Sequence, residues 1–256
     1  MIRAIDHIVI LVSDLAAAIA DYTALGFTVT PGGEHTGGAT HNALVIFADD
    51  AYLELIAFKR PAPEHHWYRH SAVGEGLIDF ALLPTLIEAD LAAARERGLE
   101  IEGPFPGGRL RPDDQQVAWQ TGRALTPDLP FLCGDVTPRV LRVPDGAART
   151  HANGVTGIAG LTVAVADLGV SVARYRALLG TAELPSSSPV AARAIFALGD
   201  TTITLATPAD TTNTPLSARL AARGEGPFAL ALRGAAQGAT FDLRLAHGAR
   251  MAPISQ

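Results

Sequence analysis

The stretch VSDLAAAIADYTALG at residues 12–26 decides the fold, because it returns at residues 165–180 as VADLGVSVARYRALLG. In the first copy, Asp14 follows an apolar run and can cap a helix, and a glycine ends that helix. A second echo supports the repeat: the tripeptide GEG precedes an apolar run at residues 74–76 and again at residues 224–226. The chain is therefore predicted to consist of tandem copies of one small module.

The first module is predicted to contain one helix and four strands. Leu15, Ile19, Tyr22 and Leu25 recur at helical spacing and should form the buried face of the helix. The strands are expected, in chain order, over residues 5–12, 27–30, 42–47 and 52–58. The glycine-rich segment PGGEHTGGAT at residues 31–40 is expected to be a flexible loop.

The same order of elements is predicted again in three later modules, of which the last is incomplete. The second module is expected to have a strand over 77–83, a helix over 86–97 and strands near Leu99, over 117–119 and over 130–133. The third is expected to have a strand from Ile158, a helix ending at Gly180 and strands over 194–198 and 201–207. The fourth is expected to have a strand over 228–232 and a short helix over 241–247.

The composition argues against several classes of protein. The chain has 256 residues, of which 48% are apolar and 18% are charged, as in an ordinary globular protein. A net charge of −6 without clustered Lys and Arg argues against nucleic acid as a partner. No apolar run reaches the ~18 residues of a membrane span. The N-terminal MIRAIDHIVI lacks the small residues of a signal-peptide cleavage site. A cytoplasmic protein with no membrane partner is expected.

Cys133 is the only cysteine, which excludes an internal disulfide and a zinc site built from several thiolates. Its expected role is that of a buried structural thiol, and the alternative is a thiolate ligand of a metal. Any metal would mainly have to be held by His, Asp or Glu.

Several segments resemble one known superfamily. DHIVILVSDL at residues 6–15, PGGEHTGGATHN at 31–42 and YLELIAF at 52–58 resemble the glyoxalase-like families of the vicinal oxygen chelate superfamily. GRLRPDDQQVAWQ at 108–120 and LPF at 129–131 resemble the second module of those families. The likeness is most specific over roughly residues 4–60 and extends more loosely to about residue 145.

The resemblance implies an α+β fold in which tandem βαβββ modules form cupped mixed sheets, about three and a half modules in all. Residues 1–150 are expected to form a glyoxalase-like domain of two paired modules, at 1–60 and 74–145. Residues 151–256 are expected to form a second, degenerate half, with one module at 155–208 and a truncated one at 224–256.

In this superfamily, ligands of a divalent metal project into the cup from the first and last strands of a module. The resemblance assigns that role to His7 and Glu54. Strand periodicity agrees, since His7 shares a face with Val9 and Leu11 and Glu54 lies in a strand that is otherwise apolar. The alternative is a buried pair in which Glu54 accepts from His7 or from a backbone amide.

The second module would have to supply further ligands. Counting nineteen residues back from the glycine that ends each helix gives His7 from Gly26 and Asp79 from Gly98. His7, Glu54 and Asp79 together would suit Fe²⁺, Mn²⁺, Ni²⁺ or Zn²⁺, although the superfamily more often has histidine at the position of Asp79. No carboxylate lies within residues 131–133, the counterpart of Glu54. The sequence is therefore equally compatible with a bound divalent metal and with the absence of any cofactor.

The C-terminal half fails as a second metal centre. Gly160 takes the place of His7, and Thr204 takes the place of Glu54. This half is expected to be scaffold or a cup for an apolar molecule.

His35 and His41 are candidates for a third ligand or a general base beside Glu54, because imidazole titrates near neutral pH. A loop anchor or a solvated side chain is the alternative for each. His65, His66 and His70 lie in a linker with two prolines, whose composition suggests surface exposure.

Four residues are candidates for binding a substrate: Asn42, Arg109, Arg111 and Trp119. The guanidinium groups suit a carboxylate or enolate oxygen. A salt bridge with Asp113 or Asp114 is the alternative for the arginines, and Asn42 could instead tie its loop to a strand.

The leading hypothesis is a metalloenzyme acting on a small oxygenated organic molecule, with lyase, isomerase or dioxygenase chemistry or metal-assisted proton transfer. The second hypothesis is a metal-free protein of the same fold that binds or sequesters a small molecule. A third is a structural partner whose truncated fourth module is completed by another chain. A monomer and a homodimer are both compatible with the sequence.

Overall fold

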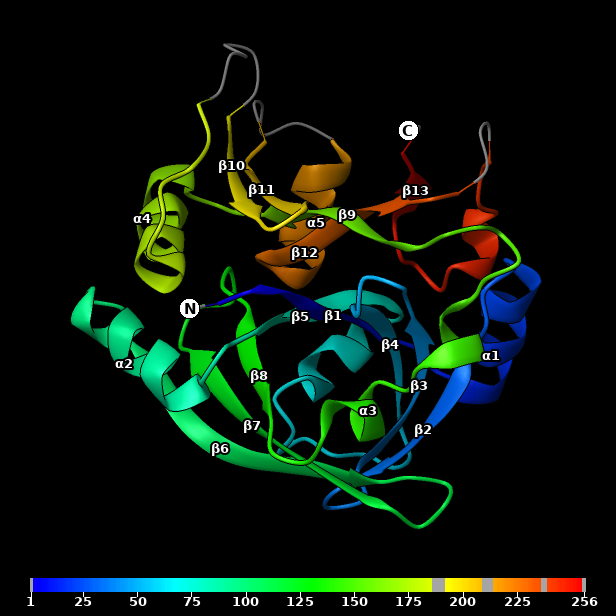
Figure 1. The fold of residues 1–256 in the computed structure, drawn as a ribbon. Coiled ribbons are helices and arrows are strands. Elements are labelled where there is room, and N and C mark those ends of the chain that lie inside the picture. Colours follow the sequence, from blue (N-terminus) through cyan, green and yellow to red (C-terminus); the bar gives the residue numbers. More distant parts are fainter. Residues whose placement is uncertain (1, 186–191, 209–213, 236–238, 255–256) are drawn as a thin grey trace.

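Eight strands of the N-terminal half close into a barrel, and five strands of the C-terminal half form a second sheet that covers it (Figure 1). The computed structural model describes residues 2–185, 192–208, 214–235 and 239–254. The barrel strands are β1 (Ala4–Leu11), β2 (Thr30–His35), β3 (Thr40–Ile46), β4 (Tyr52–Phe58), β5 (Gly76–Leu83), β6 (Ile101–Leu110), β7 (Gln116–Ala124) and β8 (Phe131–Asp135). The second sheet contains β9 (Gly157–Ala164), β10 (Arg193–Leu198), β11 (Thr201–Ala206), β12 (Gly226–Arg233) and β13 (Met251–Pro253). The helices are α1 (Leu15–Ala24), α2 (Ile87–Glu96), α3 (Arg139–Arg142), α4 (Leu168–Leu179) and α5 (Pro215–Arg223), with 3₁₀ turns η1 (Tyr68–Ala72), η2 (Gly146–Arg149) and η3 (Leu243–Leu245).

The barrel confirms the predicted α+β fold of paired βαβββ modules. Its strand order is β1-β4-β3-β2-β6-β7-β8-β5, so each module contributes four adjacent strands. β1 is parallel to β4, β5 is parallel to β8, and the modules join where β1 lies antiparallel to β5 and β2 lies antiparallel to β6. None of the helices in the described ranges is long and apolar enough to cross a membrane.

The two repeated sequence motifs, the helix starts and the GEG tripeptides, are in contact in the structure. Asp14 accepts hydrogen bonds from the first amides of α1, and Asp167 accepts one from the first turn of α4. The glutamates of the two GEG tripeptides bind just before these caps: Glu75 accepts from the amide and hydroxyl of Ser13, and Glu225 accepts from the amide of Ala166. Each glutamate therefore ties the first strand of one module to the helix start of its partner.

The prediction for the glycine-rich segment is wrong. Residues 27–29 are not a strand, and β2 occupies much of the expected loop. The reason is tertiary, because β2 pairs with both β3 and β6 and so closes the barrel. Gly33 has φ +128°, and a Cβ there would lie 2.0 Å from the carbonyl oxygen of Leu110. Only glycine allows this close approach of two backbones.

The two faces of β1 have different surroundings. Ile8 and Ile10 belong to the large core cluster that β1 shares with β9, while Val9 and Leu11 belong to a smaller cluster inside the barrel. His7 lines the barrel interior together with Glu54. The predicted inward faces of these strands are confirmed.

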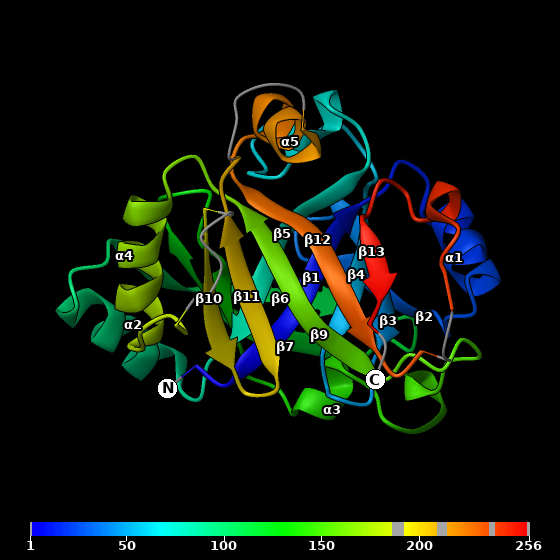
Figure 2. The same cartoon turned by 90° about the horizontal axis from the view of Figure 1, so that it is seen from above.

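The second sheet has the order β10-β11-β9-β12-β13 and lies across the barrel strands (Figure 2). The register of β9 and β11 places Gly160 and Thr204 where β1 and β4 carry His7 and Glu54, as expected. The fourth module contains β12, η3 in place of the expected helix over 241–247, and the short parallel strand β13. One hydrophobic cluster joins both halves across this interface.

Candidate active site

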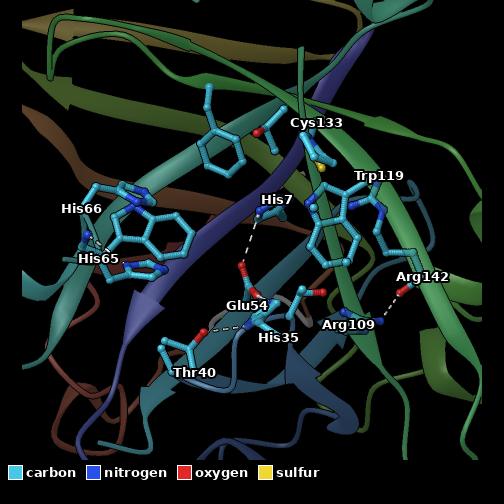
Figure 3. A pocket seen from close by; sticks show the side chains of 18 of the residues that line it. His7, His35, Thr40, Glu54, His65, His66, Arg109, Trp119, Cys133 and Arg142 are labelled. Carbon is cyan, nitrogen blue, oxygen red and sulfur yellow. Dashed lines mark hydrogen bonds and ion pairs between the residues drawn. The ribbon is translucent and has the colours of Figure 1, made fainter. Parts of the chain in front are cut away.

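A cavity of about 310 Å³ lies inside the barrel. His7, Tyr52 and Glu54 of β1 and β4 line its floor, with Phe131 and Cys133 of β8. Figure 3 shows His65 and His66 on one side of the Glu54 carboxylate and Trp119 on the other. The volume suits a small organic molecule.

A buried carboxylate fixes the ring of His7. The Nδ1 atom of His7 lies 2.6 Å from Oδ2 of Asp6, which is fully buried and accepts from Arg142 and Arg139. Burial alone raises the pKa of Asp6, but Arg142 and His7 hold it well below its ordinary value. Because ionised Asp6 only accepts, Nδ1 carries the hydrogen and Nε2 faces Glu54. The ring of Tyr52 stacks on His7 with centroids 4.7 Å apart.

Glu54 is a buried anion with three polar neighbours. Its Oε1 accepts from Asn42 Nδ2 at 2.6 Å and lies 3.4 Å from His35 Nε2, while its Oε2 lies 3.5 Å from His7 Nε2. Burial raises the pKa of Glu54, but the hydrogen bond with His35 and the charge of His7 outweigh it and lower the pKa to about 2. Glu54 is therefore ionised at neutral pH and is a weak base.

His35 lies in the pocket, as the sequence suggested, and His41 does not. Nδ1 of His35 lies 2.9 Å from the hydroxyl of Thr40, and its ring meets Trp119 edge-on. His41 is the next residue along β3, so strand alternation turns it to the outer face, near Lys59. Burial and the charge of Lys59 lower the pKa of His41. His41 is therefore not among the residues that line this pocket.

Asn42 lies beneath the pocket rather than on its surface. Its amide holds Glu54, and its Oδ1 atom is buried without a hydrogen-bond partner in the described structure. Asn42 thus positions the carboxylate, and the prediction that it contacts substrate directly is not supported by this placement.

Of the two candidate arginines, only Arg109 lines the barrel pocket. Arg109 is 3% exposed, lines the pocket, and donates to the carbonyl oxygen of Arg142 at 2.8 Å. Burial lowers the pKa of Arg109, and no ion pair of this side chain occurs within the described ranges. Arg111 lies outside the pocket and forms a two-pronged salt bridge with Asp113, as the alternative interpretation held.

Aromatic side chains form the walls. Trp119 lines the pocket from β7, as predicted, and Trp67 faces it from the linker before η1. The Arg123 guanidinium lies over the rings of Trp67 and Phe131, with its central carbon 5.6 Å and 4.9 Å from their centroids. These side chains would hold a planar molecule near a positive charge.

The expected surface exposure of the linker holds for His66, which is exposed, but not for His65, which is half-buried, or for His70. His65 and His66 line the pocket, and His70 is buried. The signal in the sequence was the run HHW at residues 65–67, since aromatic side chains in a polar linker need a surface to pack against. The linker closes one side of the pocket.

Asp79 does not join His7 and Glu54. Its carboxylate accepts from Trp67 Nε1 at 2.7 Å and from the amide of Phe80 at 2.8 Å, and it lines a neighbouring cavity of about 200 Å³. Burial raises the pKa of Asp79, which the charge of Arg123 and the hydrogen bond from Trp67 oppose. The predicted set of three metal ligands is therefore not assembled.

The remaining ligand position of the module pair is also filled by a residue that binds no metal. In the first module, Val9 lies two residues after His7 and pairs with Glu54. In the second module, Ala81 lies two residues after Asp79 and pairs with Phe131, so Phe131 is the counterpart of Glu54. Phe131 meets His7 edge-on, with ring centroids 5.4 Å apart. Burial raises the pKa of Cys133 to about 12, so this thiol is protonated. In the described residues, no group of three or more His, Cys, Asp or Glu side chains is arranged to hold a metal ion, so the donor set does not fit the one that the resemblance implies.

Comparisons with known proteins agree with this fold. The family described as Glyoxalase-like domain matches residues 5–179. No curated protein matches the chain. A hypothetical protein from Staphylococcus aureus has a similar structure, with a TM-score of 0.73, 16% identity, and coverage of 98% of this chain and 99% of that chain.

Two further solved structures are similar in fold. A mutant of 4-hydroxymandelate synthase from Streptomyces coelicolor has a TM-score of 0.63 at 17% identity, covering 91% of this chain and 71% of that chain. A fusion of a xylose isomerase-like TIM barrel with 4-hydroxyphenylpyruvate dioxygenase has a TM-score of 0.60 at 16% identity, covering 96% of this chain and 38% of that chain.

Proposed function

This chain belongs to the Glyoxalase-like domain family of the vicinal oxygen chelate superfamily, and we propose from that premise that its barrel pocket is an active site. The substrate is a small, planar, oxygenated organic anion, and the reaction is a proton transfer next to a carbonyl group. The observation that carries the proposal is the contact of 2.6 Å between Asp6 and Nδ1 of His7, which directs Nε2 of His7 into the pocket.

His7 is the general base in this proposal. An imidazole suits proton transfer near neutral pH, and Asp6 holds it in the tautomer that accepts at Nε2. The proton leaves the substrate carbon for Nε2, and the electron pair of the broken bond passes to the carbonyl oxygen as an enolate. The Glu54 carboxylate, 3.5 Å from Nε2, stabilises the imidazolium that forms.

Arg109 and the aromatic walls bind the substrate. The guanidinium of Arg109 has no carboxylate partner among the described residues and can hold the enolate oxygen. Trp67 and Trp119 would cover the faces of a planar group. No step of this mechanism uses a metal, because the donor set does not fit one.

Phenylpyruvate is a suitable probe, since it combines an aromatic ring, a carboxylate and an acidic methylene group. In deuterated buffer containing EDTA, the protein should accelerate exchange of the methylene hydrogens at least tenfold, as followed by NMR. Replacement of His7 by Gln should remove this acceleration, because general base catalysis contributes about 10²–10⁴-fold. The matched control is His41→Gln, which changes an imidazole on the outer face and should leave exchange unchanged.

Equal exchange with the wild type and His7→Gln would overturn the role of His7. Exchange that requires added Mn²⁺, Fe²⁺, Ni²⁺ or Zn²⁺ would overturn the metal-free mechanism in favour of the metalloenzyme hypothesis.

A metal-free binding protein is the second candidate, and it is favoured because both oxygens of Glu54 already contact side chains of the protein. Trp67 and Trp119 are the two tryptophans of the chain, and both line the pocket. Fluorescence that is quenched saturably by phenylpyruvate, without catalysed exchange, would support this candidate over the enzyme.

A further inference from the structure

A third cavity lies between the two halves and shares no lining residue with the barrel pocket. It has a volume of about 180 Å³ and is lined by residues of α5, by the starts of β5 and β12, and by the segment before β13. The two GEG tripeptides, at residues 74–76 and 224–226, flank it. In Figure 2, α5 lies beside the cyan segment that contains η1 and leads to the first of these tripeptides.

Three arginines line this cavity: Arg219, Arg223 and Arg250. Backbone oxygens hold two of them in place, since Arg219 donates to Gly224 and Pro227 and Arg223 donates to Gly74 and Glu75. The guanidinium of Arg250 lies over the ring of Phe228. These contacts hold the three guanidinium groups in place, but they involve uncharged groups and do not neutralise the positive charges.

Each anchored guanidinium keeps one nitrogen without a partner. Nη2 of Arg219 and Nη1 of Arg223 are buried and form no hydrogen bond in the described structure. Burial, then the charges of Arg223 and Arg69, lower the pKa of Arg219 to about 10. Guanidinium groups buried next to like charges without a counterion are costly, and an anion in the adjoining cavity would offset their charge.

The acidic side chains of the two GEG tripeptides point elsewhere. The carboxylate of Glu75 binds Ser13 and His247, and that of Glu225 binds the amide of Ala166. No ion pair of the three lining arginines occurs in the part of the chain that the structure describes.

We propose that this cavity is a binding site for a phosphate group, either free phosphate or the phosphate of a small ester. Arginine forks match the oxygens of phosphate, and a group that carries up to two negative charges suits three converging cations. The site is separate from the barrel pocket and does not depend on the reaction proposed there. It also gives the paired GEG segments a role, because their carbonyl oxygens orient the arginines.

Calorimetric titration of the full chain with sodium phosphate, at constant ionic strength set with sodium chloride, tests the proposal. Wild type should bind one equivalent saturably, and Arg219→Gln and Arg250→Gln should each weaken binding at least tenfold. The matched control is Arg244→Gln, whose side chain is 89% exposed on the same half and paired with Asp242. It should change the dissociation constant less than twofold.

A parallel titration with glycerol 3-phosphate separates the two sources. Tighter binding than that of phosphate assigns the site to a phosphate ester, and equal binding assigns it to free phosphate. The proposal is overturned if neither phosphate nor glycerol 3-phosphate binds saturably to the wild type. It is also overturned if Arg219→Gln and Arg250→Gln bind phosphate as tightly as Arg244→Gln does. Circular dichroism checks the folding of each variant, and Arg250→Gln, which removes an exposed side chain, decides the outcome if Arg219→Gln does not fold.

Discussion

His7 can act at the pocket floor because a residue that never touches the pocket holds its ring. Asp6 binds Nδ1 of His7 and is itself paired with Arg142, and both members of that pair are almost completely buried. Loss of one partner from such a pair typically costs about 3–5 kcal/mol. Substitution of Asp6 would therefore damage the fold together with the site, so His7 is the residue on which to test catalysis.

Glu54 makes a separate prediction about acid stability. Its pKa is lowered from 4.5 to about 2, so the ionised form stabilises the folded chain above about pH 4.5, and this contribution is lost as the pH falls towards 2. Between about pH 5 and pH 3 the free energy of unfolding of the wild type should fall by about 2 kcal/mol more than that of Glu54→Gln. Urea unfolding at the two pH values measures this difference.

Glu64→Gln is the matched control, because its exposed carboxylate has Arg60 as its one ion-pair partner among the described residues. It should lose stability with acid much as the wild type does. An equal loss in Glu54→Gln and wild type would contradict the assignment of Glu54 as a buried anion.

At the scale of single elements, β2 shows where local patterns fail. Its sequence, TPGGEH, has little intrinsic preference for a strand, so the local pattern predicts a loop. Pairing with β3 on one side and β6 on the other makes it a strand. By contrast, β1 and β4 were predicted within one residue of their observed ends, because apolar side chains and strand periodicity are local signals.

The closure of the barrel at β2 can be tested with two glycines of positive φ. Gly33→Ala should destabilise the chain by more than about 3 kcal/mol, because the backbone conformation and the clash with Leu110 both add cost. Gly37→Ala, which also has positive φ but open space around its Cβ, should cost only about 1 kcal/mol. Urea unfolding compares the two variants, and equal losses would show that the approach of β2 to β6 is not tight.

At the scale of the whole molecule, the second sheet forms a shared core with the outer face of the barrel. Ile8 and Ile10 of β1 share one buried cluster with Leu161 and Val163 of β9. Neither half would bury these side chains alone, and each contributes about 1.5–3 kcal/mol when it is buried. The C-terminal half thus buries the outer face of the strand that carries His7.

This shared core predicts one cooperative unfolding transition. Trp67 and Trp119 report on the barrel by fluorescence, while far-ultraviolet circular dichroism reports on both halves. The two signals should change at the same urea concentration. Leu161→Ala in the second sheet should shift both midpoints together and cost about 2–5 kcal/mol. A fluorescence transition unaffected by this substitution would mean that the halves unfold independently.

The sequence by itself determined the modular α+β fold, the inequality of the two halves, and the inward direction of His7 and Glu54. These features depend on repeats and on side-chain alternation, which are properties of short segments. Only the tertiary structure decided which side chains meet. Barrel closure brings His35 beside Glu54, and the linker brings Trp67 to Asp79 and so takes that carboxylate away from His7. Such choices depend on packing between segments far apart in the chain, which no local pattern encodes.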